Sequence, residues 1–476
     1  MKSVYEPALS EEAIDSLRVH KFGGTSVDSA GQLRAMARIV RDQGVPAVVV
    51  ASAMAGVTDE LSGLADEPEL LLESHKQFEV LETLRLRHHE ILREIVDQDE
   101  QREAIGTRIN LILDKVSALL DGPTDGNSAR LRDQMMAAGE DLVVELAAAA
   151  LQAEGIAASV LNAREVVWTD ARFGSALPDI AAIRRLAPER VGPLLDKGLT
   201  PVIQGFIGSE ADGATTTLGR GGSDFTAALL GSALGASEVV IWTDVDGIHS
   251  GDPDLVGEAV TLSDVGFEEA VELAYFGARI IHPAAAKHAI AHNVLLRIKN
   301  TFSPEHPGTL IHFDRRETAT FRAVAHKNNV ILIRVKAFPT TMAYGFLARV
   351  FEVLAQHKVP VDLVATSHSS TAFTIDRDKE LAKVQLELSE FAEVVVVEDL
   401  STVTVVGSGL LREPRIDALA FWAAEKTPVY LISQASDVSI SFVVDEAEAP
   451  ELVRRLHLSL IELRQDGESR ALRSHS

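Results

Sequence analysis

The chain has 476 residues, 46% hydrophobic and 24% charged, a balance typical of a globular protein with two or three domains. It contains no cysteine, which excludes disulfide bonds, thiolate metal sites and cysteine nucleophiles. The 45 basic and 70 acidic residues give a net charge of −25, which disfavours nucleic acid as a partner. No apolar run approaches the about 20 residues of a membrane span, and the first residues lack a signal-peptide pattern. We therefore expect a cytoplasmic protein without a membrane partner.

The first two thirds of the chain alternate short apolar strands with helices. This alternation predicts an α/β fold with a mostly parallel sheet covered by helices on both faces. Residues 1–17 form a polar leader, and residues 18–313 form the predicted domain. The predicted strands are 18–22, 47–52, 158–161, 201–207, 239–243 and 295–298, and the predicted helices include 29–43, 223–234 and 267–276. Residues 64–121 are charged and helix-periodic, which indicates a helical insertion.

The composition of the sequence changes after Phe313. Residues 314–329 are polar and indicate a linker. A repeat follows, because KVPVDL at Lys358 and KTPVYL at Lys426 stand in matching surroundings. Each is preceded by a predicted helix, at 346–356 and 416–425, and followed by a strand, at 371–375 and 438–444, and a closing helix, at 378–391 and 450–463. The repeat predicts two α+β modules at residues 330–395 and 396–465, and a tail at 466–476.

The stretch KFGGTSV, residues 21–27, ends the first predicted strand with a lysine and two glycines. Gly23 and Gly24 allow backbone N–H groups to approach a ligand, and Lys21 adds a positive charge beside a predicted helix start. This combination favours a cradle for an anion such as phosphate, although it matches neither the Walker nor the Rossmann pattern. A tight turn before a capped helix would explain the same residues.

The stretch TTTLGRGGSDF begins at Thr215 and again opens a predicted helix with glycines. Arg220 can bind a carboxylate or a phosphate through two parallel hydrogen bonds, and Ser223 adds a hydroxyl group. Asp224 lies where the helix dipole stabilises a carboxylate, so a simple capping role is the alternative.

Four further stretches place polar residues after strands or beside glycines, where ligands of open α/β sheets bind. A turn or a first-turn acid would explain each of them separately. They are WTDVDGI with Thr243 and Asp244, FGARIIHP with Arg279, AAGEDL with Glu140 near the start of an Ala-rich helix, and SAMAGVTD with Ser52 and Thr58.

With these residues in view, the chain resembles the aspartate kinases (aspartokinases) of the amino-acid kinase family over about residues 19–463. The resemblance is carried by KFGGTSV, SAMAGVTD, QGFIGS, TTTLGRGGSD, WTDVDGI and FGARIIHP in this order. It implies a carbamate kinase-like sandwich of helices around a mostly parallel sheet, followed by two ferredoxin-like ACT domains. It also implies that ATP and L-aspartate react to give ADP and 4-phospho-L-aspartate, the first step toward lysine, threonine and methionine.

The resemblance further implies roles for the candidate residues. Lys21, Gly23 and Gly24 contact the transferring phosphoryl group, and Asp224 positions Lys21. The implied aspartate-binding residues are Ser52, Thr58, Glu140, Arg220 and Ser223, with Arg220 on the α-carboxylate and Glu140 on the ammonium group. The implied ATP-binding residues are Lys21, Gly24, Thr243, Asp244, His249 and Arg279. The implied effector-binding residues are Gly345, Leu347, Val361, Asp362 and Ser367.

The chemistry of this reaction agrees with such a site. The side-chain carboxylate of aspartate has a pKa of about 3.9 and is a nucleophile at neutral pH, so no general base is required. Catalysis then consists of positioning and charge neutralisation. Mg²⁺ is expected to bridge the ATP phosphates while keeping several waters, so we expect no dedicated cage of carboxylate ligands from the protein. The ACT domains imply a homodimer or homotetramer that is regulated by lysine, by threonine or by both, although the sequence does not specify the effector.

Four positions depart from the family pattern. Arg279 stands where lysine is common, His249 where tyrosine is common, and Asp254 where arginine is common, which bears on ATP binding. His368 stands where lysine-sensitive members commonly carry an acid. Two alternatives stay open: a kinase for another amino acid, such as glutamate or N-acetylglutamate, and a non-catalytic amino-acid sensor.

Overall fold

The computed structural model describes residues 17–66, 74–121, 128–278, 281–312, 320–338, 344–367, 369–377, 380–412 and 414–462. The chain divides into two compact units. The first consists of Met1–Ile248, Ser263–Phe267 and Ile280–Phe313, and the second of His249–Leu262, Glu268–Arg279 and Asp314–Ser476. The predicted tail, nearly all of the predicted leader and residues 314–319 of the predicted linker lie outside the described residues.

The first unit is built on an eight-stranded sheet in the order β3-β4-β2-β1-β7-β9-β10-β8, in which only the β9–β10 pair is antiparallel. Its strands are β1 (Arg18–Phe22), β2 (Ala47–Ala51), β3 (Ala158–Leu161), β4 (Thr200–Gln204), β7 (Glu238–Thr243), β8 (Asp264–Gly266), β9 (Leu295–Asn300) and β10 (Thr309–His312). Every residue of β2, AVVVA, is buried, as expected for a strand covered on both faces. The predicted mostly parallel α/β fold is confirmed.

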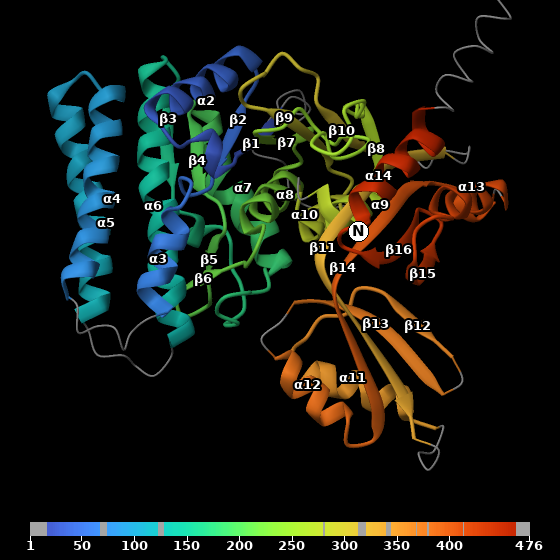
Figure 1. Ribbon diagram of the computed structural model, residues 1–476. Coiled ribbons are helices and arrows are strands. Elements are labelled where there is room, and N and C mark those ends of the chain that lie inside the picture. Colours follow the sequence, from blue (N-terminus) through green and yellow to red (C-terminus); the bar gives the residue numbers. More distant parts are fainter. Residues whose placement is uncertain are drawn as a thin grey trace, which may run out of the picture. The chain divides into compact units, whose positions relative to one another are not determined.

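Helices cover both faces of this sheet (Figure 1). One face carries α2 (Ala30–Gln43) and α6 (Ser128–Ala153), with α3 (Val57–Asp66) packed on α6. The other carries α7 (Ile180–Asp196), α8 (Gly222–Leu234) and α10 (Pro283–Ala291). A small hairpin, β5 (Ile207–Ser209) and β6 (Thr215–Thr217), lies beside α6. Short helical turns occur at η1 (Gly24–Ser26) and η3 (Ala163–Glu165).

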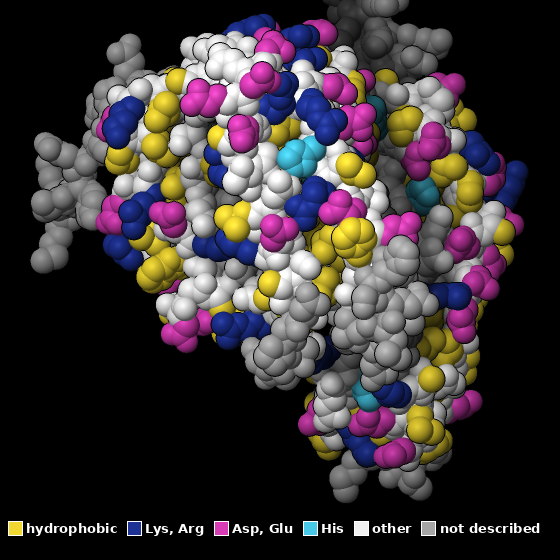
Figure 2. All heavy atoms as spheres, turned by 90° about the vertical axis from the view of Figure 1, so that its left-hand side faces the viewer, with side chains coloured by type: hydrophobic (Ala, Val, Ile, Leu, Met, Phe, Trp, Pro, Cys, Tyr) yellow, Lys and Arg dark blue, Asp and Glu magenta, His cyan; other side chains and the backbone are white. Residues whose placement is uncertain are grey.

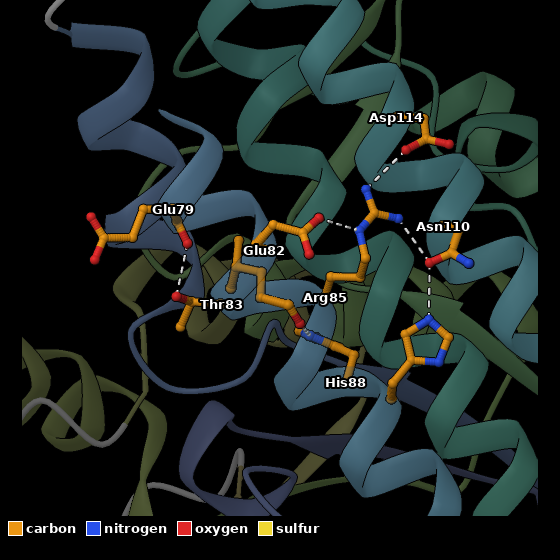
Figure 3. A network of polar contacts seen from close by, with 9 residues as sticks. Glu79, Glu82, Thr83, Arg85, His88, Asn110 and Asp114 are labelled. Atoms are coloured by element: carbon orange, nitrogen blue, oxygen red, sulfur yellow. Dashed lines mark hydrogen bonds and ion pairs between the residues drawn. The ribbon is translucent and has the colours of Figure 1, made fainter. Parts of the chain in front are cut away.

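The predicted helical insertion contains two long helices, α4 (Ser74–Ile95) and α5 (Asp99–Asp121), which pack on each other and on α6. Figure 3 shows how Arg85 of α4 reaches α5, where it donates to Asn110 Oδ1 (2.8 Å) and Asp114 Oδ1 (2.9 Å). On the outer side, basic and acidic side chains are intermixed (Figure 2), which is the pattern of a solvated helical surface.

The second unit contains a six-stranded antiparallel sheet in the order β12-β13-β11-β14-β16-β15. Its strands are β11 (Thr320–Ala337), β12 (Val364–Thr366), β13 (Ser370–Asp376), β14 (Ala392–Ser408), β15 (Val429–Ser436) and β16 (Ser439–Asp445). Its helical segments are α9 (Phe267–Leu273, whose first residue belongs to the first unit), η4 (Ala274–Ala278), α11 (Phe346–Gln356), α12 (Leu381–Leu388), η5 (Leu410–Arg412), α13 (Pro414–Ala424), α14 (Ala449–His457) and η6 (Leu458–Glu462). The order strand-helix-strand-strand-helix occurs twice, and each copy has its own apolar core.

Two details of this unit differ from the sequence-based expectation. Residues 320–329 were predicted as linker, but they begin β11 and pair with β14. Their alternation of small apolar and polar residues is that of a strand, and it was obscured by the charged residues before them. KVPVDL forms no strand, since β12 begins only at Val364 and Pro360 cannot donate a ladder hydrogen bond.

The long strands β11 and β14 are shared by the two modules. Both have a residue with positive φ near the middle, Asn329 at 59° and Asp399 at 56°, where the register between the strands shifts. Residues of β11 before this point pair with the part of β14 beside β16, and residues after it lie beside β13.

None of the helices in the described part of the chain is both long and apolar enough to cross a bilayer.

Candidate active site

The carboxyl ends of four neighbouring parallel strands carry the glycine-rich loops of the first unit. Backbone hydrogen bonds join these loops: Gly23 N donates to Trp242 O at the end of β7 (3.1 Å), and Ser52 N donates to Phe22 O at the end of β1 (3.1 Å). Gly205, directly after β4, donates to Ala51 O of β2 (2.9 Å). The sheet therefore gathers several of the predicted stretches at one edge, as expected for ligand binding in an open α/β sheet.

Lys21 and Asp224 form an ion pair at this edge. Their Nζ and Oδ1 atoms lie 2.8 Å apart, and the two side chains are only 13% and 11% exposed. Asp224 occupies the first turn of α8, and its Oδ2 also accepts from the backbone N–H of His282 (3.3 Å). The Lys21 ammonium lies 3.7 Å from where a Cβ on Gly23 would stand, so it lies against the glycine loop.

The glycine loop contains a short helical turn of its own, and the helix predicted at 29–43 follows it within one residue of the predicted start. Residues Gly24–Ser26 form a short 3-10 turn, and α2 begins only at Ala30. Ser29, rather than Thr25 or Ser26, caps α2 by accepting from Gln32 N (3.3 Å). The predicted anion cradle thus consists of the backbone of this turn together with Lys21. Glycine is required at position 24, because a Cβ there would stand 2.8 Å from Ala53 O.

Glu140 lies in the middle of α6 and not, as predicted, near the start of a helix. It is buried, and its Oε1 accepts from Ala53 N (3.1 Å), while Oε2 has no hydrogen-bond partner among the described residues. Burial raises the pKa of Glu140 to about 8, although the hydrogen bond from Ala53 opposes this. Gly139 allows this approach, since a Cβ there would lie 2.8 Å from Ala53 Cβ. An unpaired carboxyl oxygen beside Ser52 and Ala53 is suited to a ligand that supplies a cationic donor.

Arg220 stands between Gly219 and Gly221, which both adopt left-handed φ angles of 76° and 69° just before α8. Its side chain is exposed, and its charge helps lower the pKa of His282, after the larger effect of burial and against the raising effect of Asp224. His282 thus lies within electrostatic range of both Arg220 and Asp224.

The three predicted hydroxyl residues of the aspartate set occupy different elements, and Ser52 directly follows β2. Ser223 is buried against Gly205, where a Cβ would stand 2.5 Å from its hydroxyl oxygen. Thr58 lies in the first turn of α3, next to Val57, which contacts Gly139.

Two of the residues predicted to bind ATP, Thr243 and Asp244, stand at the carboxyl end of β7. Thr243 ends β7, one residue after the carbonyl that accepts from Gly23, and its hydroxyl group donates to Asp244 Oδ1 (3.1 Å). His249 belongs to the second unit, where its Nδ1 lies 3.4 Å from Thr261 Oγ1. Arg279 lies outside the described residues. The ATP contacts of His249 and Arg279 stay predictions.

Sequence reasoning missed two carboxylates near this edge. Asp28 accepts from Ala55 N (3.0 Å) and from Arg87 of α4 (2.5 Å), which links the glycine loop to the loop after β2. Asp133 is fully buried in α6 and accepts from Thr217 and Gly174. The sequence did contain an indication of this residue, because Asp133 stands seven residues before Glu140 and therefore on the same face of the helix.

The predicted effector residues lie in the first module of the second unit. Gly345 precedes α11 with a φ of 82°, and Leu347 lies in the first turn of that helix. Val361 packs against the core of the module, and Ser367 lies on the turn between β12 and β13. His368 lies outside the described residues.

Asp362, the fifth predicted effector residue, already has partners within the second unit. It accepts from Lys327 Nζ (2.8 Å) and from the hydroxyl group of Tyr275. Burial opposes the charge on Lys327, but hydrogen bonds to Asp362 and Asp376 raise its pKa overall. A ligand ammonium group would have to compete for this carboxylate.

Comparison with known proteins gives matches over nearly the whole chain. Residues 16–300 match the amino acid kinase family, and residues 403–460 match an ACT domain. Lysine-sensitive aspartokinase 3 of Escherichia coli (strain K12) is 36% identical over 453 residues, which cover 93% of this chain and 99% of that protein. An aspartokinase of Thermus thermophilus is 30% identical over 463 residues, covering 93% and 98%.

Two solved structures of E. coli aspartokinase III resemble the fold. The complex with aspartate and ADP, in the R-state, has a TM-score of 0.83 at 36% identity and covers 93% of this chain and 99% of that chain. The complex with lysine and aspartate, in the T-state, has a TM-score of 0.79 at 35% identity and covers 94% and 99%.

Proposed function

Since this chain belongs to the aspartokinases of the amino acid kinase family, we propose that its first unit transfers the γ-phosphoryl group of ATP to the side-chain carboxylate of L-aspartate. The resemblance inferred from the sequence is thereby confirmed at the level of the family. The products are ADP and 4-phospho-L-aspartate. A role for this acyl phosphate in lysine, threonine and methionine synthesis follows from the family.

The observation that carries the proposal is the pairing of two features at one edge of the sheet. The Lys21–Asp224 ion pair lies against the glycine loop, and the buried Glu140 presents an unpaired oxygen beside the neighbouring loop. The first feature suits a phosphate, and the second suits the ammonium group of a free amino acid. The second feature also disfavours N-acetylglutamate, because its acylated nitrogen carries no positive charge.

The roles of the residues follow from the charges that must meet. The attacking carboxylate and the γ-phosphoryl group are both anionic, so Lys21 and the backbone N–H groups at Gly23 and Gly24 offset their repulsion. Asp224 holds Lys21 in place through the 2.8 Å ion pair. Arg220 binds the α-carboxylate of the substrate, and Glu140 accepts from its ammonium group. Ser52, Thr58 and Ser223 line the amino-acid side, while Thr243 and Asp244 lie on the nucleotide side.

Mg²⁺ is the expected companion of ATP. The described residues contain no group of three or more acidic or histidine side chains placed to hold a metal ion. An Mg²⁺ ion that accompanies ATP would be held chiefly by phosphate oxygens and water, and Asp244, exposed directly after β7, is the carboxylate that could add one contact. When bound, Mg²⁺ neutralises phosphate charge.

The proposal is tested by measuring ADP release with L-aspartate, L-glutamate or no amino acid. Turnover that depends on L-aspartate is expected, together with hydroxylamine-trapped acyl phosphate. Turnover with L-glutamate alone would favour the kinase for another amino acid, and no turnover with either would favour the amino-acid sensor.

Regulation and assembly form the second part of the proposal. The two modules of the second unit bind an amino-acid effector, lysine or threonine, near Gly345, Leu347, Val361, Asp362 and Ser367. The chain forms a homodimer or homotetramer through these modules, and the exposed edge strand β12 supports such pairing. Titration of activity with each amino acid, and light scattering of the purified protein, test these points. A cytoplasmic location stays a prediction from the sequence.

A further inference from the structure

Asp133 is a fully buried carboxylate that belongs to no predicted binding set. It is one of the buried residues of α6, where a charged group is costly unless it is hydrogen-bonded. Three donors meet it: Gly174 N (2.9 Å) and Thr217 N (2.8 Å) at Oδ2, and the Thr217 hydroxyl group (2.9 Å) at Oδ1. All three come from loops and strands far from α6 in the sequence.

Two of these donors belong to Thr217, on the segment that carries Arg220, and the third, Gly174 N, belongs to a loop that packs against this segment. Thr217 ends β6 three residues before Arg220, and its carbonyl accepts from Ala176 N (2.8 Å). Gly219 packs against the loop that contains Gly174, since a Cβ on Gly219 would stand 3.2 Å from Gly174 O. The turn around Arg220 is thus fixed through Thr217 on one side and through Gly174 on the other.

The same helix carries Glu140 seven residues later. Seven residues are nearly two turns, so Asp133 and Glu140 share one face of α6 at a separation of about 10 Å along the axis. Between them, this face contacts the loop after β2, through Ala53, and the turn that carries Arg220, through Thr217. A rigid helix therefore spans the two groups assigned to the ammonium and the α-carboxylate of the amino acid.

We infer that Asp133 is a positioning residue for the proposed reaction, which fixes Arg220 at a set distance from Glu140 by holding Thr217 and Gly174. The inference rests on the proposed function. Asp133 acts by fixing the position of the turn around Arg220 through its hydrogen bonds. Its negative charge is not required for this role. An error of about 1 Å in the placement of a substrate group can cost up to about 100-fold in rate.

The test compares four variants of the full chain. Asp133→Ala removes all three acceptor contacts. Asp133→Asn keeps them, because its carbonyl can face the two N–H groups while its amide donates to the Thr217 hydroxyl, which can reverse. Thr217→Val removes one of the contacts at nearly constant volume. Asp170→Ala is the matched control, because Asp170 accepts from Arg172 N and Leu177 N within the same loop without reaching α6.

KM for L-aspartate, KM for ATP and thermal stability are measured for each protein. Asp133→Ala is expected to raise KM for L-aspartate at least about tenfold, and Thr217→Val about threefold, with KM for ATP changed less than about twofold. Asp133→Asn and Asp170→Ala are expected to stay within about twofold of wild type in both. If Asp133→Ala does not fold, Thr217→Val decides alone.

Three results would overturn the inference: an unchanged KM for L-aspartate in Asp133→Ala and Thr217→Val, an equal rise in both KM values, or the same effect in Asp170→Ala. An effect of Asp133→Asn as large as that of Asp133→Ala would also overturn it, since charge would then be responsible. A wild-type protein without aspartate-dependent turnover would instead refute the proposed function, before any variant is compared.

Discussion

Glu140 offers the sharpest test of the amino-acid side of the site, because its pKa couples affinity to pH. Burial raises that pKa to about 8, whereas the ordinary value is 4.5. In the unliganded protein only about 10% of Glu140 is ionised at pH 7 and about 1% at pH 6. An ammonium group binds the ionised form, so KM for L-aspartate is expected to fall by nearly tenfold per pH unit between pH 6 and 8 and to level off above.

Glu140→Gln isolates this effect. Gln keeps the acceptor for Ala53 N but cannot ionise, so its KM for L-aspartate should be high and independent of pH. The ionisation of ATP and of L-aspartate changes with pH in the same way in assays of both proteins. The difference between the two pH profiles therefore reports the ionisation of Glu140 alone. A wild-type profile parallel to that of Glu140→Gln would refute the role assigned to this carboxyl group.

The same substitution should stabilise the unliganded protein at neutral pH. The unfolded chain releases the Glu140 proton above pH 4.5, while the folded chain keeps it up to about pH 8. Between these values the raised pKa therefore favours unfolding, by about 3 kcal/mol at pH 7 and by little at pH 4. Glu140→Gln should raise the melting temperature at pH 7 and leave it nearly unchanged at pH 4. Equal shifts at both pH values would show that packing, and not ionisation, is responsible.

Three further substitutions test the remaining assignments. Lys21→Ala should lower kcat by about 100-fold or more, because it removes a charge offered to the phosphoryl group, and should also lower the melting temperature because Asp224 loses its buried partner; unchanged turnover would separate the loop from the chemistry. Arg220→Ala should raise KM for L-aspartate at least about tenfold and KM for ATP far less, and equal effects on both would contradict its role. Lys327→Met removes one of the two internal partners of Asp362 and leaves the Tyr275 hydroxyl group, so inhibition by the effector should need a several-fold lower concentration; an unchanged concentration would show that Asp362 does not bind the effector.

The sequence predicted the strands of the first unit well where helices cover both faces of the sheet. The predicted strand at 18–22 coincides with β1, and the strand predicted at 47–52 differs from β2 by one residue. Both strands are short and are followed directly by glycine or serine, so their ends are marked chemically. Glu140 was misplaced because α6 begins with the polar residues SARLRDQ, which hide twelve residues of helix before it.

The parts of the site that the sequence did not reveal depend on distant contacts. Asp133 meets Thr217 across 84 residues, and Arg87 reaches Asp28 across 59. No local pattern specifies such partners, whereas a polar residue on an otherwise apolar helical face does signal that a partner exists. The sequence does not specify which residue caps α2, since several hydroxyl residues precede that helix and only the backbone decides that Ser29 caps it.

The two sides of the site rest on different elements. The amino-acid side is organised by α6, whose two buried carboxyl groups accept from backbone N–H groups of the loops at Ala53, Gly174 and Thr217. The phosphate side is organised by β1 and α8, through Lys21 and Asp224. Substitutions on the buried face of α6 should therefore act mainly on KM for L-aspartate, and those at the Lys21–Asp224 pair mainly on kcat. Glu140 and Asp224 stand on different helices, α6 and α8, so the effects of one substitution at each should be close to additive in free energy.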